Sequence, residues 1–502
     1  MINTAASLLL QLISIICGFI VPRLIIVTYG SDVNGLTSSI TQFLSYIVLV
    51  EAGVGGVVRA ALYKPIASAD NRQISGVINA TESFFRKIAY IFAGYMVVLA
   101  ALYPFLVNRE FNFLYTSSLV IIIGLSTFAQ YYFGMTYTIF VQADQRRYIS
   151  SILQMITVVL NTVFVIVFIY LGANIHILKL GTAFVYILRP VFLNIYVRRK
   201  YKFDRSVPPD RKALSQKWDG LGHHIAYFVN LNTDVVVLTL FSKISAAVSI
   251  SEVSVYTVYY AVVSGIEKLT ESLSSGVEAA FGNIIANGEH ENLNKKFALY
   301  EFVSHTLTTF MFTCTGILIV PFIKVYTKNI SDADYIRPLF AYILVLAQAT
   351  YCLRIPYHIV TLAAGHYKQT RNGAFAEAGI NVVLSAVLVY FFGIVGVAVG
   401  TLAAMIFRTV QYAYYLSKNI LCRSLFVFIK RILISALCAV ASVAIMRFIP
   451  HMAVDSYNTW LLFALETAVV TMAVTCLINL ILSRKEFIGS VNAVRSTLTH
   501  KK

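Results

Sequence analysis

Long apolar runs alternate with short polar connections along the whole of this 502-residue chain. Each run is about as long as the roughly 20 residues of helix that cross a bilayer. The pattern therefore predicts an all-α polytopic membrane protein with about fourteen spanning helices. Their expected bounds are 4–28, 35–60, 88–106, 118–141, 150–171, 177–197, 219–241, 253–285, 298–322, 338–363, 373–392, 394–416, 430–449 and 459–482.

Composition and charge placement agree with this pattern. Hydrophobic residues make up 58% of the chain and charged residues only 13%, whereas a soluble domain is about 25% charged. If the N-terminus is inside, the inner connections and the C-terminal tail hold about four times as many Lys and Arg as the outer connections. The net charge of +17 then reflects orientation in the membrane. We expect both termini in the cytoplasm and no nucleic-acid partner.

A polar stretch with two adjacent prolines, residues 201–218, follows the sixth predicted span. It divides the chain into an N-lobe at 1–200 (spans one to six), this cytoplasmic linker, a C-lobe at 219–418 (spans seven to twelve), and residues 419–502 with two further spans and a cytoplasmic tail. The lobes read as an internal repeat, because a shift of 220 positions places Thr37 on Thr257 and Glu51 on Glu271. Such repeats are common in transporters.

Ionisable residues lie inside many of the predicted spans. Each costs about 2.5–3.5 kcal/mol at mid-depth, so most must pair, line a cavity or lie near an interface. These residues include the cations Arg23, Arg189, Lys268, Arg354 and Arg408 and the acids Glu51, Asp234, Glu267, Glu271, Glu278, Glu377 and Glu466.

Three of the arginines, Arg189, Arg354 and Arg408, fall in the inner halves of their predicted spans. Guanidinium groups are always charged and bind phosphate oxygens in pairs. These arginines are therefore candidates to bind an anionic, phosphate-bearing substrate. The alternative is that Arg354 and Arg408 form structural ion pairs with Glu377, Glu271 or Glu51, and the sequence leaves both interpretations open.

The eighth predicted span carries carboxylates at a spacing that places them on one helical face, together with Ser274: Glu267, Glu271 and Glu278. A coupling path for protons or cations is one interpretation. The other places Glu278 at the interface and offsets Glu267 with Lys268.

Two opposite charges lie in the outer halves of spans one and seven. Arg23 and Asp234 either close an outer gate between the lobes or pair locally, each within its own surroundings.

No pattern for a metal, a nucleotide or catalysis is found. The six cysteines form no CxxC pair, and the chain has no P-loop. We expect no cofactor and no enzymatic activity. Coupling to a proton or sodium gradient is left open.

Several short motifs carry a family resemblance: Pro22-Arg23, the turn Tyr29–Leu36 (YGSDVNGL), Glu51–Gly55 (EAGVG), Leu62–Pro65 (LYKP) and Asn232-Thr233-Asp234. The chain resembles the Wzx-type polysaccharide and O-antigen flippases of the multidrug/oligosaccharidyl-lipid/polysaccharide (MOP) exporter superfamily.

The resemblance implies two six-helix lobes in a V around a central cavity, with alternating access. The implied substrate is an undecaprenyl-diphosphate-linked oligosaccharide. It would cross the bacterial cytoplasmic membrane for O-antigen or capsule synthesis. Implied partners are this substrate, membrane lipids and other polysaccharide-assembly proteins. The last two spans would line a groove for the lipid tail.

The residues that bind the substrate on this interpretation are Arg23, Arg189, Arg354 and Arg408. Coupling or gating then falls to Glu51, Asp234, Glu267, Glu271 and Glu377.

Two other functions are weighed. A cation-coupled multidrug exporter of the same superfamily would use the buried acids, but the inner arginines would repel cationic drugs. A membrane polysaccharide polymerase would need a large outer loop for its acceptor site, and the longest outer connections, 107–117 and 323–337, are short.

Overall fold

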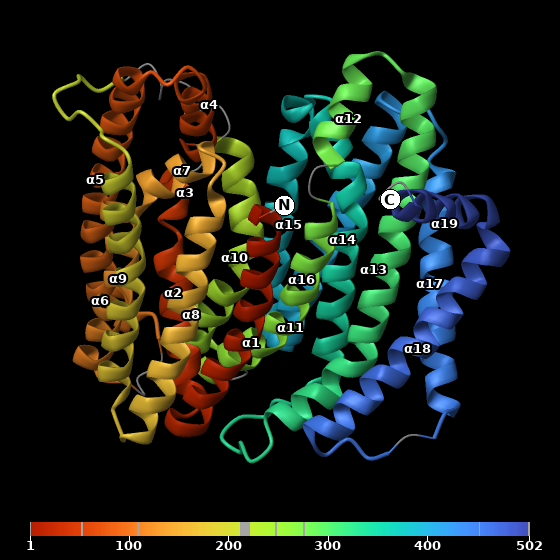
Figure 1. The fold of residues 1–502 in the computed structure, drawn as a ribbon. Coiled ribbons are helices and arrows are strands. Elements are labelled where there is room, and N and C mark those ends of the chain that lie inside the picture. Colours follow the sequence, from red (N-terminus) through yellow and green to blue (C-terminus); the bar gives the residue numbers. More distant parts are fainter. Residues whose placement is uncertain are drawn as a thin grey trace. The chain divides into compact units, whose positions relative to one another are not determined.

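The computed structural model describes residues 2–51, 54–107, 111–210, 221–245, 248–274, 277–450 and 452–499. Within these residues every regular element is helical (Figure 1). Twelve of the helical segments are long and apolar enough to cross a membrane, in reasonable agreement with the predicted number. The chain is a multi-pass helical membrane protein.

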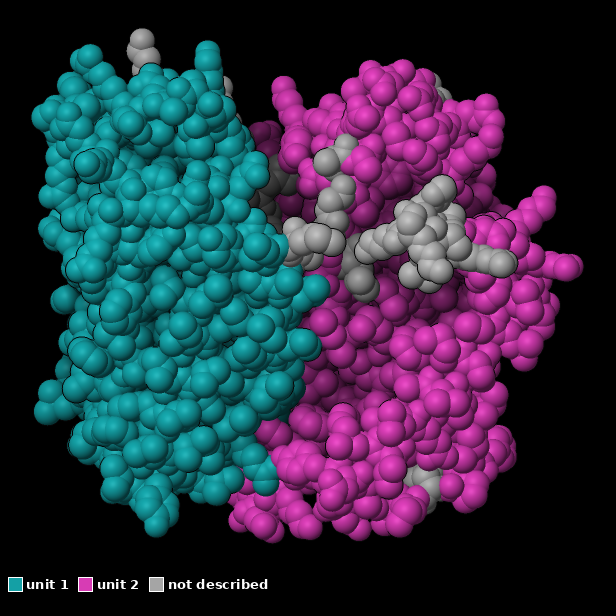
Figure 2. Space-filling view, viewed as in Figure 1, with its two compact units in different colours: residues 1–258 teal, residues 259–502 magenta. Residues whose placement is uncertain are grey.

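Packing divides the chain into two compact units, residues 1–258 and 259–502, which Figure 2 colours separately. The division falls inside one helix, α11, and does not test the lobe boundaries, which stay a prediction.

Unit 1 contains ten helices in full within its described residues, two short irregular helical segments and the start of α11. They are α1 (Ile2–Tyr29), α2 (Ser31–Ser45), α3 (Val48–Glu51), α4 (Val54–Ala67), α5 (Asn71–Leu102), the 3₁₀ turn η1 (Tyr103–Phe105), α6 (Phe113–Ala129), the π-helical turn η2 (Gln130–Gly134), α7 (Met135–Ala143), α8 (Arg147–Tyr170), α9 (Ile175–Lys200), α10 (Leu221–Ile244) and α11 (Ile250–Leu273).

Unit 2 contains the end of α11 and the remaining helices of the described chain. They are α12 (Val277–Ala286), α13 (His290–Tyr326), α14 (Pro338–Ala363), α15 (Tyr367–Phe392), α16 (Ile394–Asn419), α17 (Phe426–Phe448), α18 (Tyr457–Leu482) and α19 (Arg484–Thr499). The last of these is a helical stretch within the predicted tail.

Two predicted spans are broken rather than continuous. The second, expected at 35–60, contains α2, α3 and α4, and a turn at Tyr46 and Ile47 separates α2 from α3. The eighth, expected at 253–285, consists of α11 and α12. Glu267 and Glu271 therefore lie on α11 but Glu278 on α12, so the expected stripe of three carboxylates on one helix is wrong.

The connection expected at 59–87 is also helical. Residues up to Ala67 belong to α4, and α5 begins at Asn71. Asp70 caps α5, because its side chain accepts a hydrogen bond of 2.9 Å from the Gln73 amide. The predicted third span marked only the apolar part of a helix whose polar start lies before residue 88.

The motif at 29–36 forms a sharp corner between α1 and α2. Gly30 has φ +93°, a conformation that favours glycine. A Cβ on Gly35 would lie 2.1 Å from the carbonyl oxygen of Ile250, so this glycine lets α2 and α11 approach closely. Beside it, the Asn34 amide donates a 2.7 Å hydrogen bond to Ser254. These two positions are 220 apart in sequence, which equals the offset of the predicted repeat; the repeat itself stays a prediction.

Candidate functional site: a buried arginine–glutamate cluster

Three charged side chains on three neighbouring helices of unit 2 meet in its interior. Arg354 lies on α14, Glu377 on α15 and Arg408 on α16, three helices that pack closely together. Their exposed fractions are 5%, 6% and 3%. Because each charge is almost fully buried, the three depend on one another for compensation. We call them the arginine–glutamate cluster.

One carboxylate serves both guanidinium groups. Arg354 Nη1 donates to Glu377 Oε1 at 2.5 Å, and Arg408 Nε lies 3.5 Å from Glu377 Oε2. The cluster thus holds two positive charges and one negative charge. Over these three residues alone the net charge is +1, before the nearby carboxylates of α11 are included.

Tyrosine rings and backbone groups hold the two arginines. The Arg354 guanidinium lies 4.8 Å from the centre of the Tyr351 ring, and that of Arg408 lies 4.2 Å from the centre of Tyr412. Arg408 also donates to the Tyr412 hydroxyl and to the carbonyl of Thr370, both at 2.9 Å. Cation–π and hydrogen-bond contacts of this kind fix the direction of each guanidinium.

The carboxylates of α11 approach the same cluster. The Tyr351 hydroxyl donates a 2.7 Å hydrogen bond to Glu271 Oε1. Glu267 is buried and close enough to Glu271 and Arg354 for electrostatic interaction. Five of the candidate residues from the sequence therefore gather in unit 2: Glu267, Glu271, Arg354, Glu377 and Arg408.

The remaining candidates lie in unit 1. Arg189 on α9 donates to Gln154 on α8. Asp234 on α10 accepts a 2.8 Å hydrogen bond from the Tyr256 hydroxyl of α11, which is the local kind of pairing that the sequence left open. Arg23 is half-buried on α1.

Glu51 has a distinct environment at the end of α3. Its side chain is hydrogen-bonded to Tyr131, which lies in the π-helical turn η2. Glu51 Oε2 is buried and has no hydrogen-bond partner within the described part of the chain. π-Helical turns inside longer helices are frequent at functional sites, so Glu51 stays a coupling candidate on chemical grounds.

Sequence reasoning missed one buried ion pair. Glu301 on α13 accepts hydrogen bonds from Tyr357 at 2.5 Å and from both terminal nitrogens of Arg423, with Nη1 at 3.0 Å. A signal was present, because Glu301 falls inside the predicted span 298–322. Arg423, in contrast, lies in the connection before α17 and reads as an ordinary loop residue.

An apolar groove runs along unit 2 beside the cluster. Its volume is about 1040 Å³, and side chains of α13, α14, α16 and α17 form most of its wall. The lining residues include Phe312, Val345, Leu353, Thr409, Ile432 and Ala439. Leu353 and Thr409 directly adjoin Arg354 and Arg408 in sequence, so the groove and the arginine–glutamate cluster share two helices.

Comparisons with known proteins identify the fold. No protein-family profile matches the sequence, and no curated protein is a detectable sequence relative. The lipid II flippase MurJ in an inward closed conformation is similar in structure, with a TM-score of 0.71 and 14% identity over 96% of this chain and 99% of MurJ.

Two multidrug transporters also resemble the chain. An inward-facing MATE transporter of the MOP superfamily has a TM-score of 0.63 and 12% identity over 83% of this chain and 98% of its own. The MATE multidrug transporter DinF-BH has a TM-score of 0.59 and 12% identity over 83% of this chain and 95% of its own. The chain therefore has the fold that MurJ and these MATE transporters share.

Proposed function

We propose that the protein is a flippase for undecaprenyl-diphosphate-linked oligosaccharides. It moves them across the bacterial cytoplasmic membrane by alternating access, for the synthesis of O-antigen, capsule or another surface polysaccharide. Both termini lie in the cytoplasm in this proposal. The substrate, membrane lipids and other polysaccharide-assembly proteins are its proposed partners, and an ion gradient rather than ATP drives it.

The observation that supports this most is the extent of the structural match. The lipid II flippase structure covers 96% of this chain, whereas each of the two MATE structures covers 83%. A flippase that handles a lipid-linked substrate therefore accounts for more of the chain than an exporter does.

The chemistry of unit 2 supports the same substrate class. A diphosphate needs cationic donors, and the arginine–glutamate cluster supplies two guanidinium groups for one carboxylate. A polyprenyl chain needs an apolar surface, and the adjoining groove of about 1040 Å³ supplies it. In the proposed cycle, the diphosphate competes with Glu377 for Arg354 and Arg408 while the prenyl chain stays in the groove.

The second candidate is a cation-coupled multidrug exporter. Its support is Glu51, which has one buried carboxylate oxygen without a protein partner in the described residues. Such an oxygen can accept a proton or bind a cation. It serves a coupling role equally well in a flippase, so it does not by itself favour export of drugs.

Deletion of the gene in its native host separates the two functions. The flippase proposal expects lipid-linked repeat units to accumulate in the cytoplasmic leaflet while surface polysaccharide disappears. A wild-type copy should restore the polysaccharide, and a copy with Arg354→Gln and Arg408→Gln should not. Unchanged surface polysaccharide together with a new sensitivity to cationic drugs would instead identify an exporter.

A further inference from the structure

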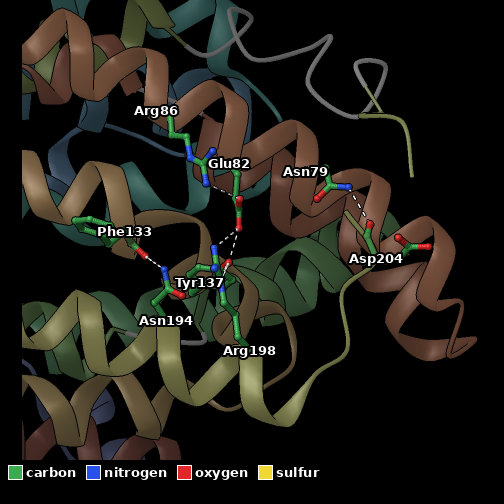
Figure 3. A network of polar contacts seen from close by, with 8 residues as sticks. All are labelled: Asn79, Glu82, Arg86, Phe133, Tyr137, Asn194, Arg198 and Asp204. Carbon is green, nitrogen blue, oxygen red and sulfur yellow. Dashed lines mark hydrogen bonds and ion pairs between the residues drawn. The ribbon is translucent and has the colours of Figure 1, made fainter. Parts of the chain in front are cut away.

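A second charged site lies in unit 1, separate from every candidate residue of the proposed transport path. It is a pocket of about 520 Å³ between α5, the η2–α7 segment and α9 (Figure 3). Three arginines line it, Arg86, Arg198 and Arg205, together with Glu82. We call it the arginine pocket.

Glu82 organises the charged end of the pocket. Its carboxylate lies 3.3 Å from Arg86 Nη2 and 3.4 Å from Arg198 Nη2. The Tyr137 hydroxyl donates to the same carboxylate and accepts a 2.8 Å hydrogen bond from Arg198 Nε. Figure 3 shows Glu82 between the two arginines. One acid thus holds guanidinium groups from α5 and α9 toward a common space.

The pocket keeps an excess of positive charge after these pairs are formed. Three arginines and one glutamate leave a net charge of +2. Arg86 Nε is buried without a hydrogen-bond partner among the described residues. Within the described residues, Arg205 makes no hydrogen bond and no ion pair. The buried Arg86 Nε and the excess of positive charge both favour an anion in this pocket.

The third arginine is held in place by its own loop. The Asp204 amide donates a 3.0 Å hydrogen bond to Ser75 Oγ on α5. The Asn79 side chain donates to the carbonyls of Asp204 and Val207 at 3.0 and 2.9 Å. This part of the predicted linker therefore lies against α5, which brings Arg205 to the pocket that it lines.

The rest of the wall is apolar. Phe133, Val191 and Ile195 also line the pocket, and Phe133 and Ile195 are exposed on the surface of the protein. Along α9, Val191 precedes Arg198 by about 10 Å of helix. The pocket thus passes from an apolar surface to a cluster of cations, which is the profile of a phospholipid from its acyl chain to its phosphate.

We propose that the arginine pocket binds the phosphate of an anionic membrane phospholipid, with an acyl chain along Phe133, Val191 and Ile195. Basic pockets between membrane helices bind such headgroups. Guanidinium forks match phosphate oxygens in geometry and charge. A free phosphate ion shares the headgroup chemistry, but it makes no use of the apolar wall. This site is independent of the transported substrate.

Native mass spectrometry of the purified full-length protein tests the proposal. Phosphatidylglycerol and phosphatidylcholine are titrated separately into wild-type protein, Arg198→Gln and Arg205→Gln. Lys87→Gln and Lys202→Gln are matched controls, because both lysines are exposed and neither lines the pocket. We expect wild type to prefer phosphatidylglycerol, and each arginine variant to bind it about tenfold more weakly than its control.

Two results would overturn the proposal. One is equal binding of phosphatidylglycerol by Arg205→Gln and Lys202→Gln. Because Arg205 makes no hydrogen bond or ion pair within the described chain, this variant stays informative even if Arg198→Gln unfolds. The other is displacement of bound phosphatidylglycerol by millimolar inorganic phosphate, which would assign the pocket to a soluble anion.

Discussion

Glu377 forms two ion pairs, whereas Arg354 and Arg408 each form one with it. Its carboxylate is the partner of Arg354 at 2.5 Å and of Arg408 at 3.5 Å, and all three side chains are buried. Removal of one partner from a buried pair leaves an uncompensated charge and costs about 3–5 kcal/mol. The number of uncompensated charges therefore depends on which of the three residues is removed.

Glu377→Gln should lower stability more than Arg354→Gln does. The first change leaves two buried cations without their carboxylate and should cost about 3–5 kcal/mol. The second leaves Arg408 to balance Glu377 and should cost less. Thermal unfolding of the purified variants in detergent measures the order. The double variant Arg354→Gln with Glu377→Gln should be more stable than Glu377→Gln alone, and the reverse order would refute the shared-carboxylate description.

Glu51→Gln should uncouple transport from its ion gradient without unfolding the protein. Glu51 Oε2 already lacks a protein partner in the described residues, so the amide removes little structural stabilisation while it removes the site for a proton or cation. Transport with and without the gradient is the measurement, and Tyr131→Phe is the companion variant because it removes only the hydrogen bond. Gradient-dependent transport by Glu51→Gln at wild-type rates would exclude this residue from coupling.

Some of these contacts could be predicted from the sequence, and others could not. The cost of buried charge predicts that Arg354 and Arg408 need a partner, and Glu377 is one of the acids inside the predicted spans. The pairing of Asp234 with Tyr256 depends on which faces of α10 and α11 meet, which no local pattern specifies. Arg423, the partner of Glu301, lies in a connection between helices. A charged residue is ordinary there, so nothing in the sequence marks it as part of a buried ion pair.

At the scale of helices, close contact between α2 and α11 depends on a residue without a side chain. A Cβ at position 35 would lie 2.1 Å from a backbone carbonyl, which cannot rotate away. Gly35→Ala should therefore separate the helices and cost about 1–3 kcal/mol. Gly18→Ala is the matched control, because nothing lies within 4 Å of its Cβ. Equal unfolding temperatures for the two variants would contradict the close approach.

The groove of unit 2 provides a second test at this scale. Ala439 lines it, whereas Ala444 on the same helix is exposed and does not. Ala439→Phe should fill part of the groove and weaken the binding of a polyprenyl diphosphate about tenfold or more, because the prenyl chain loses apolar contact. Ala444→Phe should bind it as wild type does. Equal binding by the two variants would show that the groove does not hold the prenyl chain.

Hydrophobic runs predicted where the helices lie, but not how they break. The runs locate the apolar parts of α5, α8, α14 and α18 because a spanning helix needs a minimum length. They merge α2 with α3, and α11 with α12, because a short turn such as Tyr46–Ile47 or Ser274 between two apolar segments hardly changes the mean hydropathy. The polar start of α5 was missed for the opposite reason, since a helix outside the bilayer needs no apolar run.

At the scale of the whole molecule, composition and the spacing of the apolar runs were together enough to predict the class of protein. The 58% hydrophobic content and the spacing of the runs require a membrane-embedded helical fold, and the similarity to MurJ and the MATE transporters agrees with it. The substrate is a different matter. It depends on a few side chains, such as Arg354 and Arg408, whose grouping becomes visible only after the helices are packed.

Movement of a labelled undecaprenyl-diphosphate oligosaccharide between the leaflets of proteoliposomes tests the central claim most directly. With the purified wild-type protein, the inner-leaflet label should reach the outer leaflet far faster than in protein-free vesicles. A variant with both Arg354→Gln and Arg408→Gln should be as slow as those vesicles, provided that it remains folded. No acceleration by wild-type protein, in a preparation that does transport a cationic dye, would contradict the account.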